Sequence, residues 1–446
     1  MQRRDFLGAF GLAGAASLLG STSLPGAAAG SDYRALVIVF LHGGNDGHNC
    51  LVPTDGAYTS YQNARANLAL LKNSLVTLKG QAAGHTFGVH PSLAPLATLY
   101  NDGRLGWIAN VGPLMEPATA QQVIDGAVDV PPFLLSHSDQ VAIQQGWLVE
   151  DDMSGWAGRG LELLPSVLRN PVAAVTMSTD RTLLLGRNSG VAYLDRNGSR
   201  YWGFSDLAQP GTMGTQSINR MARWQFANAY EAEYARTFGA AVDDAARFTR
   251  AMVNAPLPAA DFGSNYFAEQ LRTIATALPR LKEQGLRRQV FLTNYGGFDT
   301  HANQRGNGEN TQDTLLKDVA KAVAAFDQTM RTNGMNDEVL TLMMTDFGRT
   351  VRPGSGGGSE HAWGNHWFAL GGPVQGGTVH GQFPSAVLGG PDDSDLGKNG
   401  RHVPTTSTDQ VGATVMRWLG LPDNLLHEVF PHLANFNQKT IPLLRA

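Results

Sequence analysis

Long apolar runs that end in polar, glycine-containing loops are the feature that most restricts the fold of this chain. Such runs lie at 35–41, 105–111, 289–293 and 338–345, and amphipathic stretches that suit helices lie at 264–285 and 313–333. A strand that is apolar along its whole length is covered on both faces, as in a parallel sheet flanked by helices. Apolar strands alternating with helices therefore predict an α/β fold with a mainly parallel sheet.

The composition restricts the class of protein further. With 446 residues, of which 42 % are hydrophobic, the chain is long enough for a large core. A net charge of −4 without a basic run argues against a nucleic-acid partner. The single cysteine, Cys50, excludes an internal disulfide and any multi-cysteine metal site. Between 180 and 215 the sequence is rich in Gly, Asn, Ser and aromatic residues, which predicts an inserted loop or cap.

The first 29 residues have the pattern of an export signal. Arg3-Arg4 is followed by a moderately apolar stretch and then by Ala27-Ala28-Ala29, which together indicate a twin-arginine (Tat) signal peptide. We therefore expect the Tat translocase as a partner, a periplasmic or secreted location and a main domain over 30–446. No later segment has about 18 unbroken apolar residues, so we expect the mature chain to be soluble, with no stable membrane anchor.

Three polar loops follow three of the predicted strands and carry the candidate ligands. Because the carboxyl ends of parallel strands share one edge of the sheet, these loops are expected to converge. Aspartate and histidine side chains are ligands for Zn²⁺, Mn²⁺ or Ca²⁺, so the loops predict one or two divalent ions. The candidates are Asp46 after the first strand, Asp299 and His301 after 289–293, and Asp346, His361 and His366 after 338–345, with Glu360 able to assist. Arg349 is expected to fork onto a phosphate or sulfate group.

A fourth polar segment, Ser136-His137-Ser138-Asp139, follows Pro131-Pro132. A serine at a helix start beside a metal ion can act as a nucleophile, because the ion and the helix N-terminus stabilise the alkoxide. Ser136 is therefore the candidate nucleophile, with His137 as a further catalytic candidate. The alternative is a structural Ser-His cap.

The motifs in this order resemble a known family. The leader, GGNDG (43–47), SHSDQ (136–140), GGFDTHANQ (296–304), DFGRT (346–350) and EHAWGNHWFALGG (360–372) are similar to an exported, sulfatase-like bacterial family, domain of unknown function 1501, in the alkaline phosphatase superfamily. The resemblance implies a three-layer α/β/α sandwich. It implies Asp46, Asp299, His301, Asp346 and either His361 or His366 as metal ligands, and Ser136 as the counterpart of the nucleophile.

Two positions depart from the superfamily pattern. Phe347 follows Asp346 where superfamily phosphatases carry histidine, so a second metal site lacks a ligand, and Leu135 stands where the family commonly has arginine. The segment at Cys50 also lacks the proline and arginine that formylglycine sulfatases require after the modified residue.

The expected function is hydrolysis of sulfate or phosphate esters, with an anionic ester such as a sulfated or phosphorylated glycan as the substrate. The alternative is a non-catalytic binding or assembly protein on the same scaffold. A third hypothesis, a metal-free serine esterase, would let His42-Gly43-Gly44 serve as an oxyanion loop, but the G-x-S-x-G elbow of such enzymes is absent from the sequence. Trp363 and Trp367 could stack on a sugar ring, although core packing is the favoured interpretation.

Overall fold

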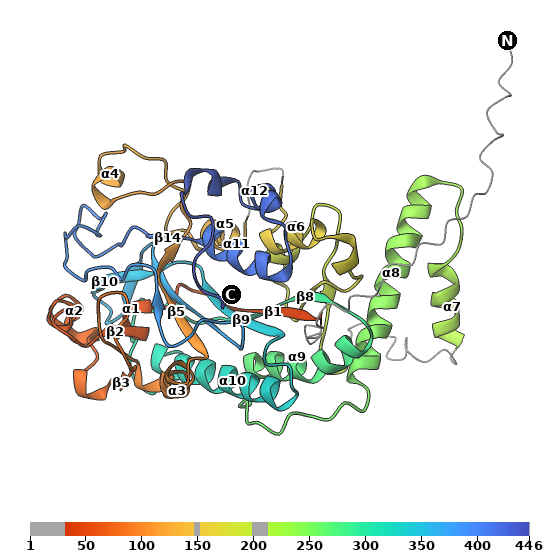
Figure 1. The fold of residues 1–446 in the computed structure, drawn as a ribbon, viewed down its shortest axis with the longest axis horizontal. Helices are drawn as coiled ribbons and strands as arrows, with labels where there is room; N and C mark the ends of the chain where they lie inside the picture. Colours follow the sequence, from red (N-terminus) through yellow and green to blue (C-terminus); the bar gives the residue numbers. More distant parts are fainter. Residues whose placement is uncertain (1–31, 147–151, 199–212, 446) are drawn as a thin grey trace, which may run out of the picture. The chain divides into compact units, whose positions relative to one another are not determined.

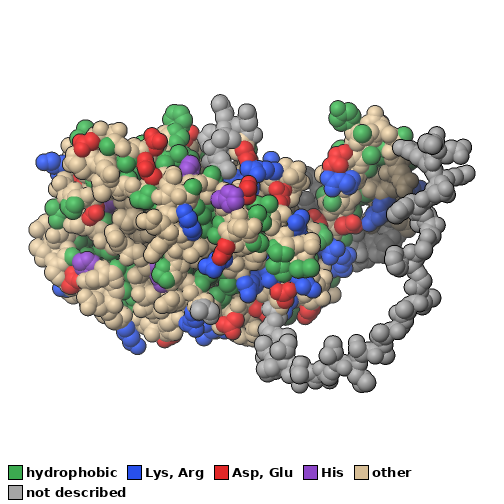
Figure 2. Space-filling model, turned by 45° about the horizontal axis from the view of Figure 1, so that its top comes forward, with side chains coloured by type: hydrophobic (Ala, Val, Ile, Leu, Met, Phe, Trp, Pro, Cys, Tyr) green, Lys and Arg blue, Asp and Glu red, His purple; other side chains and the backbone are tan. Residues whose placement is uncertain are grey.

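The computed structural model describes residues 32–146, 152–198 and 213–445. The signal peptide predicted at 1–29 lies outside these residues. None of the helices in the described ranges has the length and hydropathy needed to cross a membrane. Figure 2 shows acidic and basic side chains interspersed over the face that it displays.

Nine strands within the described residues form one mixed sheet (Figure 1). Along the sheet they are β13 (Val379–His380), β5 (Leu105–Gly112), β12 (Asn365–Leu370), β9 (Val339–Thr345), β1 (Arg34–Leu41), β8 (Arg288–Tyr295), β6 (Ala174–Thr176) and β7 (Ala192–Tyr193), with β14 (Thr406–Ser407) also pairing with β5. The run from β9 through β1, β8 and β6 to β7 is parallel, whereas β12 is antiparallel to both β5 and β9. The prediction of a mainly parallel sheet is confirmed.

Helices cover both faces of this sheet (Figure 1). On one face lie α3 (Ala94–Asn101), α9 (Tyr266–Glu283) and α10 (Gln312–Thr332), and on the other α5 (His137–Gln144), α6 (Trp156–Glu162), α11 (Thr408–Leu419) and α12 (Leu426–Val429). Burial from both sides explains why β1 is apolar at every position from Ala35 to Leu41. The expected three-layer α/β/α sandwich is confirmed, and Trp363 and Trp367 are both buried by packing.

Further helices and short strands lie outside these three layers. They are α1 (Gly47–Cys50), α2 (Tyr58–Arg65), α4 (Ala120–Ile124), α7 (Met213–Ala222), α8 (Ala229–Met252), the sheet of β2 (Leu51–Pro53), β3 (Val76–Thr77) and β4 (Phe87–Val89), and the pair β10 (Arg349–Pro353) and β11 (Ser359–His361). In the segment 180–215, where we expected a loop or cap, the described part includes edge strand β7, and residues 199–212 lie outside the described residues.

The register of the central strands positions the site. Leu41, the last residue of β1, lies opposite Tyr295 at the end of β8 and opposite Thr345 at the end of β9. All three strands therefore end at the same level, and the loops that follow them leave the sheet side by side. Capping fixes the long helix that follows β8, since the Thr311 side chain accepts a hydrogen bond from the Thr314 amide at the start of α10.

Candidate metal centre

The candidate site begins where β1, β8 and β9 end. The loop after β1 passes so close to the loop after β8 that a Cβ on Gly43 would lie 2.3 Å from the Asp299 amide nitrogen. Gly43 has a φ of +113°, which other residues rarely adopt. Its amide donates to Asp346 Oδ2 at 3.0 Å, so the first loop also holds the carboxylate that follows β9.

Three hydrogen-bond acceptors meet in this space. His301 Nε2 lies 2.9 Å from His361 Nε2, and the two nitrogens lie 3.0 and 3.2 Å from Asp299 Oδ1. The Nδ1 atom of His301 faces a Glu360 carboxylate oxygen at 2.7 Å, and that of His361 faces the Leu135 carbonyl at 2.7 Å. Because a carboxylate and a carbonyl only accept, each ring carries its proton on Nδ1 and presents a lone pair at Nε2. Three lone pairs at this spacing form a set that a cation stabilises.

His137 approaches the same point from the start of α5. Its Nδ1 atom donates to Asp346 Oδ2 at 2.7 Å, and its Nε2 atom lies 3.4 Å from Asp299 Oδ1. The hydrogen bond to Asp346 is the largest cause that raises the pKa of His137 above its ordinary value. Two buried atoms here, His137 Nε2 and Asp346 Oδ1, have no hydrogen-bond partner within the described residues.

These observations test whether a metal ion suits the residues present. His137, Asp299 and His361 each offer a ligand atom within 4.8 Å of the other two, and His301 lies against two of them. Imidazole nitrogens with one carboxylate oxygen are a donor set that Zn²⁺ favours. Glu360, Asp346 and the Leu135 carbonyl orient the rings from behind, as outer partners of metal-bound histidines do. The residues fit a divalent ion.

Arg349 does not have the role expected from the sequence. Its guanidinium is fully buried, donates to Asp299 Oδ1 at 2.8 Å and also bonds the Ser359 carbonyl. Burial raises the pKa of Asp299, but Arg349 and the neighbouring imidazoles outweigh burial and hold that pKa below its usual value. Arg349 thus keeps Asp299 ionised and in place, and its donors are not free to fork onto an anion.

Asp46 also lies apart from the cluster. It caps α1, where its Oδ1 accepts from the His48 amide at 3.1 Å, while its Oδ2 pairs with Arg65 and accepts from Gln304 Nε2 at 2.6 Å. Arg65 and Asp46 are both buried, so the negative charge of the carboxylate is already balanced by the guanidinium of Arg65. The expectation that Asp46 binds metal is therefore not supported by its contacts.

Of the two alternative histidines, His361 joins the cluster and His366 does not. His366 is buried on β12, stacks on Phe383 with ring centroids 4.8 Å apart, and accepts from the Asn110 amide at Nδ1. Its ring lies 5.8 Å from that of His48, which in turn lies 5.1 Å from His402. His366 thus belongs to a separate, buried group of histidines.

Ser136, the expected nucleophile, precedes α5 without capping it. Its hydroxyl donates to the Asp139 carboxylate and lies 3.3 Å from the Ser138 hydroxyl. The hydroxyl is thus engaged within its own segment, whereas the neighbouring His137 ring reaches into the cluster.

A pair that the sequence did not identify completes the site. His42 Nε2 lies 3.1 Å from Asp180 Oδ2, and Gln145 Nε2 donates to the same oxygen at 3.0 Å. Asp180 follows β6, so the rule that polar residues gather after strands applies to it as well. An open cavity of about 420 Å³ lies beside the centre, and His42, His137, Ser138, Asp299 and Asp346 are among the residues that line it.

Comparison with known proteins gives a family and a set of structural likenesses. The chain is similar to the lipoteichoic acid synthase LtaP from Listeria monocytogenes (12 % identity, 87 % of this chain and 72 % of that chain covered, TM-score 0.30). It is also similar to a protein in the alkaline phosphatase superfamily from Vibrio parahaemolyticus (10 %, 88 % and 67 %, 0.35) and to the sulfatase PsFucS1 from Pseudoalteromonas sp. (8 %, 88 % and 72 %, 0.32). A search of curated proteins gives no match. The family model "Protein of unknown function (DUF1501)" matches residues 33–428, and the chain therefore belongs to the DUF1501 family.

Proposed function

We propose that this protein is an exported, metal-dependent hydrolase of sulfate or phosphate esters. The observation that carries the proposal is the meeting of His301 Nε2, His361 Nε2 and Asp299 Oδ1 within 2.9–3.2 Å, with all three atoms presenting lone pairs. His137 Nε2 supplies a fourth donor from α5. A divalent ion bound there supplies Lewis-acid polarisation of an anionic ester. Zn²⁺ fits this donor set best, with Mn²⁺ and Ca²⁺ as the other expected ions.

The residues around the cluster have separate roles in the proposed reaction. Arg349 holds Asp299 ionised, and Glu360 and the Leu135 carbonyl fix the two imidazole rings. His42, paired with Asp180 and one-third exposed at the cavity, is positioned to give a proton to the ester oxygen, which then leaves as the alcohol. Water is the nucleophile that the geometry favours, because His137 and Ser138 are among the residues that line the cavity and Ser136 is not. Attack on sulfur or phosphorus would break the ester bond and release an alcohol with sulfate or phosphate.

The test is hydrolysis of 4-nitrophenyl sulfate and 4-nitrophenyl phosphate by the mature chain after incubation with Zn²⁺, Mn²⁺ or Ca²⁺. Asp299→Ala should abolish the activity while circular dichroism remains that of the folded chain. His427→Ala, a change at an exposed histidine on α12, is the matched control and should keep full activity. Full activity in Asp299→Ala would overturn the proposal.

One observation favours the second candidate, a non-catalytic binding protein. Among the described residues that line the 420 Å³ cavity there is no lysine or arginine, and the arginine expected to hold the anion is engaged by Asp299. Such a protein would bind a sulfated oligosaccharide and never release sulfate from it. Sulfate release measured over days by ion chromatography separates the two candidates.

A further inference from the structure

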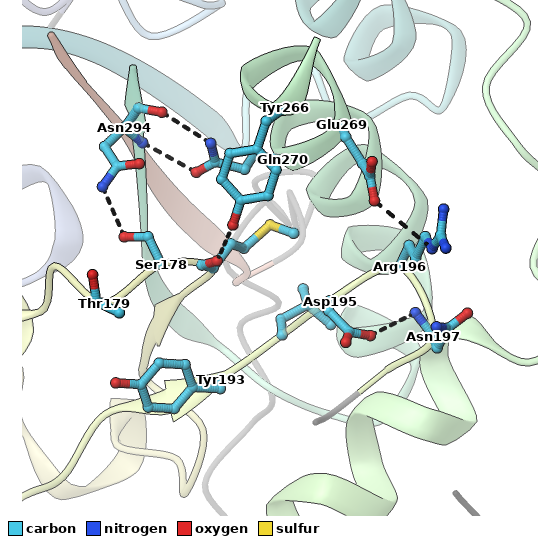
Figure 3. Close-up of a pocket in the computed structure, with 12 residues that line it drawn as sticks. Ser178, Thr179, Tyr193, Asp195, Arg196, Asn197, Tyr266, Glu269, Gln270 and Asn294 are labelled. Carbon is cyan, nitrogen blue, oxygen red and sulfur yellow. Dashed lines mark hydrogen bonds and ion pairs between the residues drawn. The ribbon is translucent and has the colours of Figure 1, made fainter. Parts of the chain in front are cut away.

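A second, larger cavity lies on the same edge of the sheet as the candidate centre, and Figure 3 shows the residues that line it. Its volume is about 840 Å³, within the usual range for small-molecule sites. The loop after β6, the turn after β7 and the first turns of α9 form its walls, and Asn294 at the end of β8 contributes to its floor.

The loop after β6 connects the larger cavity with the candidate centre. Ser178 and Thr179 line the larger cavity, and Asp180, the next residue, contacts His42 in the candidate centre. Thr176, the last residue of β6, lies opposite Leu292 of β8, which lies opposite Ile38 of β1. Because adjacent strands are about 4.8 Å apart, the end of β6 lies about 10 Å across the sheet from Ile38, three residues before β1 ends. One molecule a few rings long can therefore occupy both cavities.

The floor of the larger cavity is rigid and polar. Gln270 Nε2 donates to the Asn294 carbonyl at 2.9 Å, and the Asn294 amide donates back to Gln270 Oε1 at 3.1 Å. Asn294 Nδ2 donates to Ser178 Oγ at 2.8 Å (Figure 3). These bonds tie β8, α9 and the loop after β6 together and leave hydroxyl and amide groups at the surface of the cavity.

Two exposed aromatic rings stand over this floor. Tyr193 is 39 % exposed and Tyr266 is 56 % exposed, and Figure 3 shows them on different sides of the hollow. The Tyr266 hydroxyl donates to the Met177 carbonyl at 2.7 Å, which fixes the ring against the loop after β6. An exposed ring held in place offers a flat apolar face beside polar groups.

The charged side chains that line the cavity determine which ligands it can bind. Arg196 lies 3.9 Å from Glu269, and Asp195 adds a further carboxylate, so acidic groups outnumber basic ones. A sulfate or phosphate group would be repelled here, whereas carboxylates and amides accept and donate hydrogen bonds to hydroxyls.

We propose that this cavity binds a neutral sugar ring of the molecule whose ester group enters the adjacent metal centre. The C–H face of a pyranose packs on Tyr193 or Tyr266, and its hydroxyls bond to the polar floor and to the acidic rim. The inference rests on the proposed function only in saying what occupies the neighbouring centre. By this inference, the larger cavity selects the substrate by recognising the sugar that carries the ester group.

Binding of uncharged probes tests this directly, without any hydrolysis. Saturation-transfer NMR and calorimetry are run with methyl glycosides of glucose, galactose and N-acetylglucosamine and with their neutral disaccharides. At least one should bind the wild-type chain. At least one of the variants Tyr193→Ala and Tyr266→Ala should weaken binding about threefold to tenfold, the loss expected for one aromatic contact. Tyr193→Phe keeps the ring and should bind as the wild type does.

Two further variants locate the probe. Tyr234→Ala, at an exposed tyrosine on α8, is the matched surface control and should leave binding unchanged. Asp299→Ala should also keep sugar binding, even though it removes the proposed hydrolysis, so the two proposals fail separately. The inference is overturned if no neutral sugar binds, if binding is indifferent to both tyrosines, if Asp299→Ala abolishes it, or if adenosine binds through the tyrosines in place of the sugars.

Discussion

The Nε2 atoms of His301 and His361 lie 2.9 Å apart although each ring has its proton on the opposite nitrogen. Two lone pairs that face each other, with a carboxylate oxygen beside them, repel one another unless a cation or a proton lies among them. Burial lowers the pKa of His361 below its ordinary value, which disfavours the proton at that ring. The pair of histidines is the strongest indication that this edge of the sheet binds a metal ion.

Glu360 should set the strength of metal binding without being a ligand. Its carboxylate holds His301 Nδ1 at 2.7 Å, so Glu360→Ala frees the ring to rotate and to change tautomer. We expect metal affinity about 10-fold to 100-fold lower, the usual effect of losing an outer partner of a metal-bound histidine. Competition with a chromogenic chelator measures it. Glu360→Gln, which still offers an acceptor oxygen, should lose less, and an unchanged affinity in Glu360→Ala would contradict this role.

Asp46 should stabilise the fold and should not contribute to metal binding. Asp46→Ala leaves the buried Arg65 without its carboxylate, and breaking a buried ion pair costs about 3–5 kcal/mol in the free energy of unfolding. Urea denaturation measures this cost, and elemental analysis of the same preparation should give the wild-type metal content. Loss of the metal from a variant that is still folded would restore Asp46 as a ligand.

The buried histidine group predicts sensitivity to acid. Burial lowers the pKa of His366 to about 3, and burial also lowers the pKa values of His48 and His402. In the unfolded chain a histidine takes up its proton near pH 6.5, so between pH 6.5 and about 3 the unfolded state binds more protons than the folded state. Stability is therefore complete above pH 6.5 and falls as the pH falls. His366 alone should lower the free energy of unfolding at pH 5 by about 2 kcal/mol, relative to its value well above pH 6.5.

His366→Asn provides the matched variant for this effect. Asparagine keeps an acceptor where His366 Nδ1 accepts from the Asn110 amide but does not titrate. The difference in unfolding free energy between pH 7.5 and pH 5, measured with urea, should be about 2 kcal/mol smaller in the variant. Equal pH dependence in both chains would show that His366 is not the group responsible.

The sequence predicted the scaffold of the site well, for a physical reason. Strands β1, β8 and β9 are recognisable because each is buried on both faces and is therefore apolar throughout, and parallel pairing brings their ends to one edge. The meeting of Asp299, His301 and His361 follows from that arrangement.

The partners of buried charges could not be predicted in the same way. Asp46 and Arg349 follow strands as a metal ligand and an anion-binding group would, but tertiary packing gives them Arg65 and Asp299 as partners. Nothing in the local pattern distinguishes a carboxylate that meets a metal from one that meets an arginine 19 residues along the chain. His361 and His366 were equally ambiguous, because the turn between β11 and β12 decides which of them faces the cluster.

The most direct test of the account is the metal content of the protein, purified without chelators and measured by elemental analysis. We expect about one equivalent of Zn²⁺, Mn²⁺ or Ca²⁺ per chain in the wild type and in the exposed-histidine control His427→Ala. We expect none in Asp299→Ala and His361→Ala when both remain folded by circular dichroism. A wild-type chain that is free of metal and takes up none on incubation with these ions would contradict the account.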